Sequence, residues 1–321
     1  MTREYHLSDR SCTQTTFGAG PDFAPMPDRA RRGIYFVSGR LSGALVVYNA
    51  RTRQSFDLVT ESSTQPVLSH NGRRVAYVKF VSGRNQELWL ADVDGNNSVK
   101  LASSANLVTL SFSPDGSQFA FADAENGIQR LYVIRSDGSG LHQVPWSGSS
   151  INWATWSPDA KTLYFSGFQK DPLKLATWKV TASESKVESL AEGCGNAQDV
   201  SADSRYILSV NYSGSNLGVT ALSAVDRKCI RLMPGLPVFI AHFSSDTRSI
   251  LYLVASHGET LIYRRPWQDD KLSGPAQFAM KLPFAFRQGF AGNAYDFSRD
   301  LSTIVYARPG GQADLYLLKP E

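Results

Sequence analysis

The stretch SFSPDG at residues 111–116 decides the fold, because a close copy, TWSPDA, follows at residues 155–160. Weaker copies lie on both sides of this pair. Aligned on an Asp or Asn, the copies give seven anchors, which are Asp28, Asn71, Asp115, Asp159, Asp203, Asp246 and Asp300. The steps between them are 43, 44, 44, 44, 43 and 54 residues. A repeat of about 40 to 45 residues is the length of a four-stranded propeller blade.

The residues around each anchor follow one order. Proline fixes its own backbone, Asp accepts hydrogen bonds from nearby amides and Gly admits a left-handed conformation, so the anchor predicts a tight turn. A strand-forming run follows, such as Phe119-Ala120-Phe121, and after a polar loop a third strand, such as Leu131-Tyr132-Val133. The turn at Asp137-Gly138 then leads to a fourth strand. Each repeat therefore predicts four antiparallel strands.

We therefore predict an all-β protein, a seven-bladed β-propeller of four-stranded antiparallel blades that occupies residues 1–321 as one domain. The predicted blades are 20–62, 63–106, 107–149, 150–195, 196–237, 238–285 and 286–321. The last blade lacks a fourth strand, and we expect the strand at 3–8 to supply it. Pairing the two termini would close the ring and remove exposed sheet edges.

Composition sets limits on partners and compartment. The 33 basic residues are scattered among 29 acidic ones, for a net charge of +4, so we expect no nucleic-acid binding. The sequence has no apolar run of the roughly 20 residues that a membrane span needs, and we expect no membrane insertion and a monomer. We expect a cytoplasmic protein if the chain is complete, and a periplasmic or otherwise extracytoplasmic one if it comes from a longer anchored parent.

Three cysteines, Cys12, Cys194 and Cys229, are too few for a disulfide scaffold and have no metal-binding spacing. Free thiols are the expectation. A disulfide between Cys194 and Cys229 is the alternative, because Cys194 lies at the start of the predicted blade 196–237 and Cys229 near its outer strand.

The repeat at 111–140 resembles the WD-like propeller repeat of the TolB family, and the resemblance extends over nearly the whole chain. This resemblance implies the fold. It is shared by TolB, by extracytoplasmic sensor regions of bacterial serine/threonine kinases, by propellers of prolyl oligopeptidase relatives and by oligogalacturonate lyases, so it leaves the activity open. TolB itself carries a further α/β domain for which this sequence has no counterpart, so a stand-alone or sensor propeller of a bacterial protein fits better.

An enzymatic site is not expected. The five histidines do not assemble into a metal site, and no Gly-x-Ser-x-Gly elbow is present, so we predict no catalytic residues, no metal and no cofactor. Loops on a rigid scaffold and inner strands are where propellers bind. The expected ligand-binding residues are polar or aromatic side chains of these segments, namely Arg40, Arg84, Asn126, Lys170, His242, His257, Asn293 and Tyr295.

The sequence therefore predicts a non-catalytic binding or scaffold module that captures a protein, a peptide or a small polar ligand at the channel mouth. It fits the sensor part of a bacterial signalling protein. A propeller-type polysaccharide lyase or hydrolase with a channel site is the alternative. Trp146 and Trp267, which lie in loop-like sequence, are the two tryptophans that we consider for stacking on a sugar.

Overall fold

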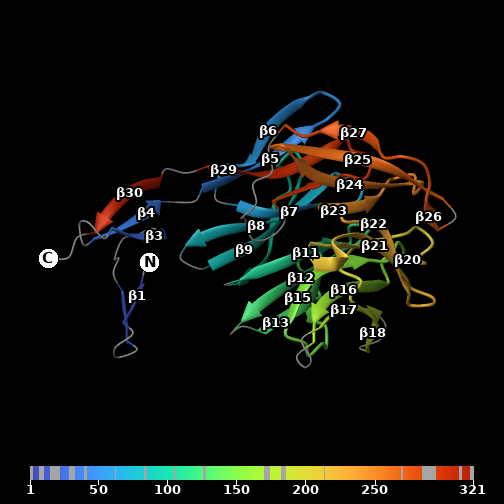
Figure 1. Cartoon of the computed structure of the whole chain (residues 1–321), viewed down its shortest axis with the longest axis horizontal. Helices are drawn as coiled ribbons and strands as arrows, with labels where there is room; N and C mark the ends of the chain where they lie inside the picture. Colours follow the sequence, from blue (N-terminus) through green and yellow to red (C-terminus); the bar gives the residue numbers. More distant parts are fainter. Residues whose placement is uncertain are drawn as a thin grey trace.

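The structure, a computed structural model, describes a chain built almost wholly of strands. The described residues are 3–6, 11–14, 22–28, 33–39, 42–61, 63–82, 85–104, 106–125, 128–169, 174–181, 186–212, 214–268, 270–283, 294–310 and 313–318. Within these ranges one short 3-10 helix, η1 (Gly214–Asn216), accompanies the strands. Figure 1 shows the strands arranged as blades around a common centre.

Six antiparallel sheets form the blades. Blade 1 contains β7 (Ser63–Leu68), β8 (Arg74–Ser82), β9 (Asn85–Asp92) and β10 (Val99–Ser104). Blade 2 contains β11 (Leu107–Phe112), β12 (Gln118–Glu125), β13 (Ile128–Arg135) and β14 (His142–Gln143). Blade 3 contains β15 (Ser150–Trp156), β16 (Thr162–Phe168), β17 (Leu175–Thr181) and β18 (Val187–Glu192).

Blade 4 contains β19 (Asn196–Val200), β20 (Tyr206–Asn211), β21 (Gly218–Ser223) and β22 (Cys229–Pro234). Blade 5 contains β23 (Val238–Phe243), β24 (Ser249–Ser256), β25 (Glu259–Gln268) and β27 (Gln277–Lys281), and β26 (Lys271–Leu272) pairs with the end of β25. Blade 6 joins the two ends of the chain, because β28 (Tyr295–Phe297) and β29 (Thr303–Gly310) pair with β5 (Ser42–Asn49) and β6 (Gln54–Val59).

The prediction of seven blades is wrong. Half of the predicted first blade and half of the predicted last blade make blade 6, and the other strands lie outside the propeller. Strands β3 (Asp22–Asp28), β4 (Gly33–Gly39) and β30 (Ala313–Leu318) form a separate sheet. The predicted closing strand at 3–8 is also wrong, because β1 (Arg3–His6) pairs with β2 (Ser11–Gln14) and not with the last blade.

The physical reason lies in the pairing of four strands. Strand β5 pairs with β29 up to Ser42 opposite Gly310, and β4 pairs with β30 from Gly39 opposite Ala313. The two ladders follow one another in register, so β4 running into β5 lies antiparallel to β29 running into β30. A hairpin between β4 and β5, or between β29 and β30, would need the same backbone N–H and C=O groups that these two ladders use. A repeat pattern records the strands but not this choice of partner.

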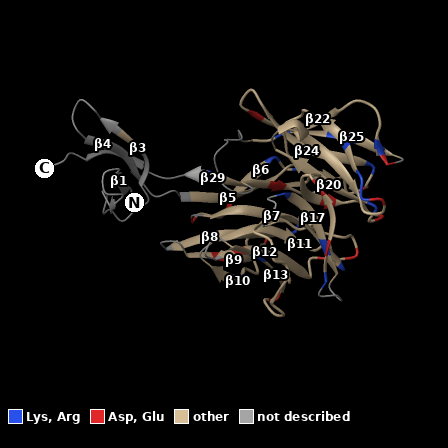
Figure 2. Cartoon of the chain, turned by 60° about the horizontal axis from the view of Figure 1, so that its bottom comes forward, with Lys and Arg blue, Asp and Glu red and all other residues tan. Residues whose placement is uncertain are grey.

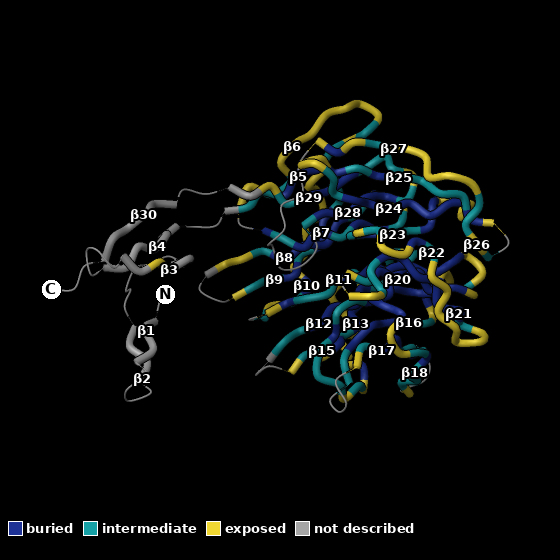
Figure 3. Tube along the Cα trace, in the orientation of Figure 1, coloured by how far each residue is buried: buried dark blue, intermediate teal, exposed yellow. Residues whose placement is uncertain are grey.

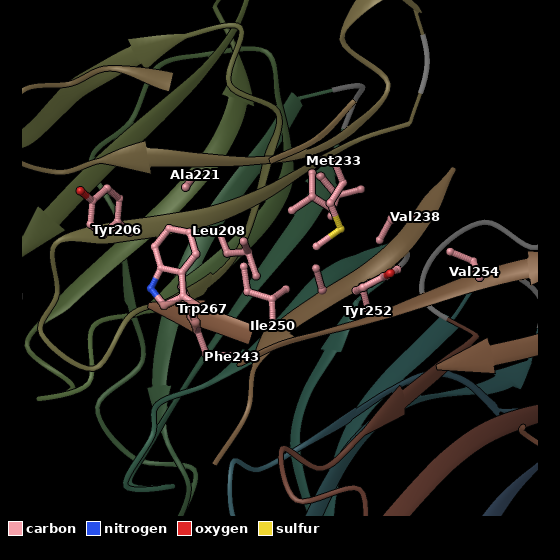
Figure 4. Close-up of a cluster of buried hydrophobic side chains, with 13 residues drawn as sticks. Tyr206, Leu208, Ala221, Met233, Val238, Phe243, Ile250, Tyr252, Val254 and Trp267 are labelled. Carbon is pink, nitrogen blue, oxygen red and sulfur yellow. The ribbon is translucent and has the colours of Figure 1, made fainter. Parts of the chain in front are cut away.

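The core lies between neighbouring blades, and each interface has its own cluster of apolar side chains. The cluster between blades 4 and 5 packs Trp267 edge-on against Tyr206 and Phe243, with ring centroids 5.6 and 6.0 Å apart (Figure 4). Leu45 of blade 6 packs with Tyr77 of blade 1, which closes the ring. Figure 3 shows buried strand centres surrounded by exposed connections. Trp267 is therefore a core residue, and its assignment as a sugar-stacking candidate was wrong.

Six of the seven anchors form the same hydrogen-bonded turn after an inner strand. In blade 3 the Ser157 hydroxyl donates to Asp159 Oδ1 at 2.6 Å and accepts from the amide of Thr162 at 2.9 Å. The Asp159 carboxylate also accepts from the amide of Lys161 at 3.1 Å. The hydroxyl-to-anchor bond recurs at Ser69–Asn71, Ser113–Asp115, Ser201–Asp203, Ser244–Asp246 and Ser298–Asp300. The seventh anchor, Asp28, ends β3 outside the propeller.

Cys194 and Cys229 form a disulfide, so the expectation of free thiols was wrong for these two residues. Their Cα atoms are 5.6 Å apart, within the range that a disulfide spans. Cys194 is buried where the chain enters blade 4, and Cys229 begins the outer strand of the same blade. The bond therefore ties the two ends of one blade together.

Candidate functional site

Each of the first five inner strands carries a β-bulge, where its register with the second strand shifts. A bulge inserts an extra residue and redirects the side chains around it. Gln65 and Thr109, at two of the bulges, have φ angles of 52° and 55°. This conformation is rare for a β-branched residue such as Thr109 and marks a shape that the surrounding blades impose. The bulges thus set which inner-strand side chains reach the channel.

One position of the repeat forms a ring around the channel. It lies two residues before the anchor serine, and its occupants in blades 1 to 6 are Val67, Ser111, Thr155, Asp199, His242 and Asp296. Five of these six line a cavity of about 50 Å³ in the channel, together with Trp153, Gln198 and Arg299. A site needs roughly 10–15 Å³ to hold one water, so this cavity has room for a few waters or the tip of one side chain.

Asp199 joins blades 4, 5 and 6. Its Oδ2 accepts a hydrogen bond from the amide of Phe243, in the neighbouring blade, at 2.8 Å. Its Oδ1 accepts from the amide of Val200 at 2.8 Å and forms an ion pair with the guanidinium of Arg299. The Asp199 side chain is 1% exposed and that of Arg299 is 17% exposed. This pair spans from blade 4 to the anchor turn of blade 6.

Asp296 repeats this arrangement between blades 6 and 1. Its Oδ2 accepts from the amide of Leu68 at 2.7 Å, and its Oδ1 accepts from the amide of Phe297 at 2.8 Å. The imidazole Nε2 of His242 lies 3.2 Å from the same Oδ1. His242 Nδ1 lies 3.9 Å from Asp199 Oδ2, so the His242 ring stands between the two carboxylates.

Arg299 also donates to His70 Nε2 at 2.8 Å. Burial is the largest cause that lowers the pKa of His70 to about 2, and the positive charge of Arg299 acts in the same direction. His70 is therefore neutral at physiological pH, and its unprotonated Nε2 can accept the guanidinium hydrogen. The five side chains form one network that we call the channel network: His70, Asp199, His242, Asp296 and Arg299.

The rim next to this network is polar and aromatic. Gln198 donates to the hydroxyl of Tyr212 at 2.7 Å, and its side-chain carbonyl accepts from the amide of Ala241 at 2.9 Å. The rings of Trp153 and Tyr212 lie 6.2 Å apart at an angle of 47°. Trp153 is half-buried and lines the cavity, so an aromatic face stands beside the charged network.

Three of the predicted ligand-binding residues lie in the described part of the chain. His242 faces the channel. Tyr295 is buried at the start of the blade 6 inner strand, and burial raises the pKa of its phenol. His257 is exposed in the turn between β24 and β25, with its Nδ1 2.8 Å from the Ser256 hydroxyl, away from the channel cavity. The other predicted residues, Arg40, Arg84, Asn126, Lys170 and Asn293, lie outside the described residues.

Sequence reasoning missed four of the five members of the channel network. Asp199 and Asp296 could have been found by aligning the repeats, because both begin an Asp-x-Ser-x-Asp pattern at 199–203 and 296–300, where the other repeats carry no acid two residues before the serine. Arg299 and His70 occupy the position after the serine, which is Pro114 or Pro158 in the best-matching repeats. Polar residues at positions that point inward were the available signal.

Within the described segments, no group of three or more His, Cys, Asp or Glu side chains is placed to hold a metal ion. No helix of the described residues is long and apolar enough to cross a membrane. Figure 2 shows basic and acidic residues interspersed over the strand ends and loops of the propeller.

Comparison with solved structures finds the same fold. The putative TolB of Agrobacterium tumefaciens superimposes with a TM-score of 0.62 at 17% identity, over 85% of this chain and 99% of that one. TolB from Acinetobacter baumannii gives 0.55 at 18% identity, over 88% and 67%. An oligogalacturonate lyase in complex with manganese gives 0.53 at 15% identity, over 83% and 82%. At such identities the likeness concerns the fold alone.

Sequence comparison bears on the family of the chain and not only on its fold. The TolB homolog of Chlorobaculum tepidum is 33% identical over 93 residues, which are 29% of this chain and 21% of that protein. A family model described as the TolB β-propeller domain matches residues 53–264, from the outer strand of blade 6 to the third strand of blade 5. The prediction of a TolB-like repeat is therefore confirmed, and the chain belongs to the TolB β-propeller family.

Proposed function

We propose that this propeller is a non-catalytic binding module that captures a peptide segment of a partner protein at the mouth of its channel. The ring of inner-strand residues with the channel network at its centre carries the proposal. It offers charge, hydrogen-bonding groups and the aromatic face of Trp153 on a rigid frame. Binding sites are built in this way, with a few fixed polar groups beside an apolar surface.

The two carboxylates of the channel network have a structural role. Both oxygens of Asp199 and both oxygens of Asp296 accept hydrogen bonds from backbone amides, including one from the next blade in each case. A general base or nucleophile needs a free lone pair within reach of the substrate. These carboxylates instead hold neighbouring inner strands together and position Arg299 and His242 at the channel.

The size of the cavity supports a partner that lies across the mouth. With room for a few waters, the cavity admits the end of one side chain, and the remaining contacts must come from the rim. Tryptophan and arginine are the residues that most often dominate protein interfaces. Trp153, half-buried at the cavity wall, is the anchor that we assign to this contact.

The disulfide supports an extracytoplasmic location for this function. Disulfides persist in oxidising environments and are rare in the reducing cytosol of mesophiles. The Cys194–Cys229 bond thus favours the extracytoplasmic alternative over the cytoplasmic one. An extracytoplasmic propeller that captures a peptide fits the sensor role in a bacterial signalling protein.

Selection from a random peptide library displayed on phage tests the proposal. The immobilised chain is expected to enrich peptides whose affinity falls at least about tenfold on Trp153→Ala, the loss expected when an aromatic anchor worth about 1.4 kcal/mol is removed. Trp89→Ala is the matched control, because Trp89 lies on the third strand of blade 1, outside the channel cavity. It should leave the affinity unchanged.

Circular dichroism should first show that both variants fold, so that a loss of affinity reports on the binding site and not on unfolding. Peptides that bind the Trp153→Ala variant as tightly as the parent chain would refute the channel mouth as the site. Failure to enrich any peptide that binds below about 1 mM would refute peptide capture itself.

A further inference from the structure

A second cavity lies where the chain passes from blade 2 to the outer strands of blade 3. Its volume is about 410 Å³, and Pro145, Trp146, Gln169 and Trp178 are among the residues that line it. A volume of this size is in the range of small-molecule sites, which run from about 300 to 1,000 Å³. The channel network has no part in this cavity, which we call the indole pocket.

The outer strand of blade 2 is short, and the chain that follows it lines this pocket. Strand β14 has two residues, whereas the fourth strands of the other blades have five or six. After it the chain turns at Pro145, and Trp146 packs onto blade 3, edge-on to Phe165 with ring centroids 5.5 Å apart. The segment that leaves β14 at Pro145 thus forms one part of the pocket wall, and Gln169, Trp178 and Val187 of blade 3 form the rest.

Two glycines leave room for the Trp146 ring. A Cβ on Gly148 would lie 2.0 Å from Cζ2 of Trp146, and one on Gly167 would lie 2.6 Å from Cη2. Any larger residue at either position would displace the indole. Trp146 and Trp178 meet at 65° with ring centroids 6.1 Å apart, so the two indoles form a corner.

The polar groups of the pocket are not committed elsewhere among the described residues. The Gln169 amide side chain and the Ser147 hydroxyl have no hydrogen-bond partner in the described chain, and the indole Nε1 of Trp178 is a buried donor without one. None of the lining residues is charged. A carboxamide offers a donor and an acceptor side by side, which matches two adjacent hydroxyls.

We propose that the indole pocket binds a neutral saccharide unit. The apolar face of a sugar ring packs on an indole, as other apolar groups do on aromatic surfaces, and its hydroxyls bond to Gln169 and Ser147. An ionised ligand would find no opposite charge among the lining residues, and the loss of its hydration would go uncompensated. This inference uses residues separate from those of the channel site and does not depend on the function proposed there.

Titration of the chain with neutral oligosaccharides tests the proposal. The probes are cellohexaose, mannohexaose and chitohexaose, with a polyproline peptide as the competing class, and binding is measured by isothermal calorimetry. At least one oligosaccharide should bind with a Kd below about 5 mM. Trp146→Ala and Gln169→Ala should each weaken it at least about fivefold to tenfold, which corresponds to the loss of one aromatic contact or one hydrogen-bonding group.

Further variants keep the result interpretable. Gly148→Ala retains every lining side chain but moves the Trp146 ring, and it should also weaken binding. Gln169→Ala alters a half-buried polar side chain at the end of β16, so it stays informative if Trp146→Ala fails to fold. Trp153→Ala, in the channel, should leave saccharide binding unchanged. Binding that survives both Gln169→Ala and Gly148→Ala would overturn the assignment of the pocket. A preference for polyproline, or no binding of any saccharide, would overturn the ligand.

Discussion

Replacing Asp199 by alanine should destabilise the propeller more than any other single change in the channel network. The substitution removes the acceptor for the buried amide of Phe243 in blade 5 and for that of Val200 in blade 4. It also leaves the guanidinium of Arg299 without its carboxylate partner. One aspartate thus holds three blades to one another, and its loss acts on all three.

The magnitude follows from those contacts. A buried donor left without an acceptor costs about 1–3 kcal/mol. Removing one partner of a buried ion pair costs about 3–5 kcal/mol. The Arg299 side chain is 17% exposed and keeps its hydrogen bond to His70, so the ion-pair cost should lie at the low end. We expect Asp199→Ala to lower the free energy of unfolding by about 5 kcal/mol, which takes the low end for both amides and for the ion pair.

Equilibrium unfolding in urea, followed by tryptophan fluorescence and far-UV circular dichroism, measures this loss. With an m value of about 3 kcal/mol per molar urea, the midpoint should fall by at least about 1 M. Arg299→Met is the matched control. It leaves Asp199 with both of its backbone donors, and it should cost only about 1–2 kcal/mol.

The double variant Asp199→Ala/Arg299→Met decides whether the two side chains act as a pair. If they do, its cost should be smaller than the summed costs of the single variants by at least about 1 kcal/mol. A loss below about 1 kcal/mol for Asp199→Ala, or strict additivity in the double variant, would show that the network does not join the blades.

Three more predictions concern stability. Asp159→Ala should lower the free energy of unfolding by about 1–2 kcal/mol, because it removes the acceptor of the anchor turn. Asp159→Asn should lower it by less than about 0.5 kcal/mol, because Asn71 makes the same turn in blade 1. Equal shifts in melting temperature for the two variants would contradict this. The pKa of His70 in the folded protein, about 2, lies below its value in the unfolded chain, about 6.5. The contribution of neutral His70 to the free energy of unfolding is therefore complete above pH 6.5 and falls by about 1.4 kcal/mol per pH unit below it. Urea midpoints at pH 7.5, 6.5 and 5.5 should show this slope, and His70→Gln, which keeps an acceptor for Arg299, should flatten it; the same slope in both proteins would exclude His70 as its source. Replacing both Cys194 and Cys229 by serine should cost about 4 kcal/mol for a separation of 35 residues, and thiols that react with a thiol reagent in the unreduced protein would show that the bond is absent.

Much of the fold was readable from the sequence because the anchor is a local structure. In blade 3 the donor Ser157 and the acceptor Asp159 are two residues apart, so the turn forms from neighbouring residues alone. Such a turn leaves the same pattern in every repeat. The all-β class, the four-stranded blades and the TolB-like repeat followed from it.

The site was less readable, because its members come from different blades. Asp199 and Arg299 are separated by 100 residues, and Asp296 and Leu68 by 228. Their contacts depend on how the ring closes. The sequence placed His242 on an inner strand facing the channel, but it contained no local sign that two carboxylates would stand on either side of its ring.

The sequence by itself determined the repeating turn, the strands and the family, since each of these depends on residues close together along the chain. Tertiary structure alone decided the number of blades. Strand β5 had two antiparallel partners with equivalent backbone groups, the neighbouring β4 and the distant β29, and it pairs with β29. Backbone hydrogen bonds carry no record of which strand supplies them, so only the closed ring of six blades made that choice.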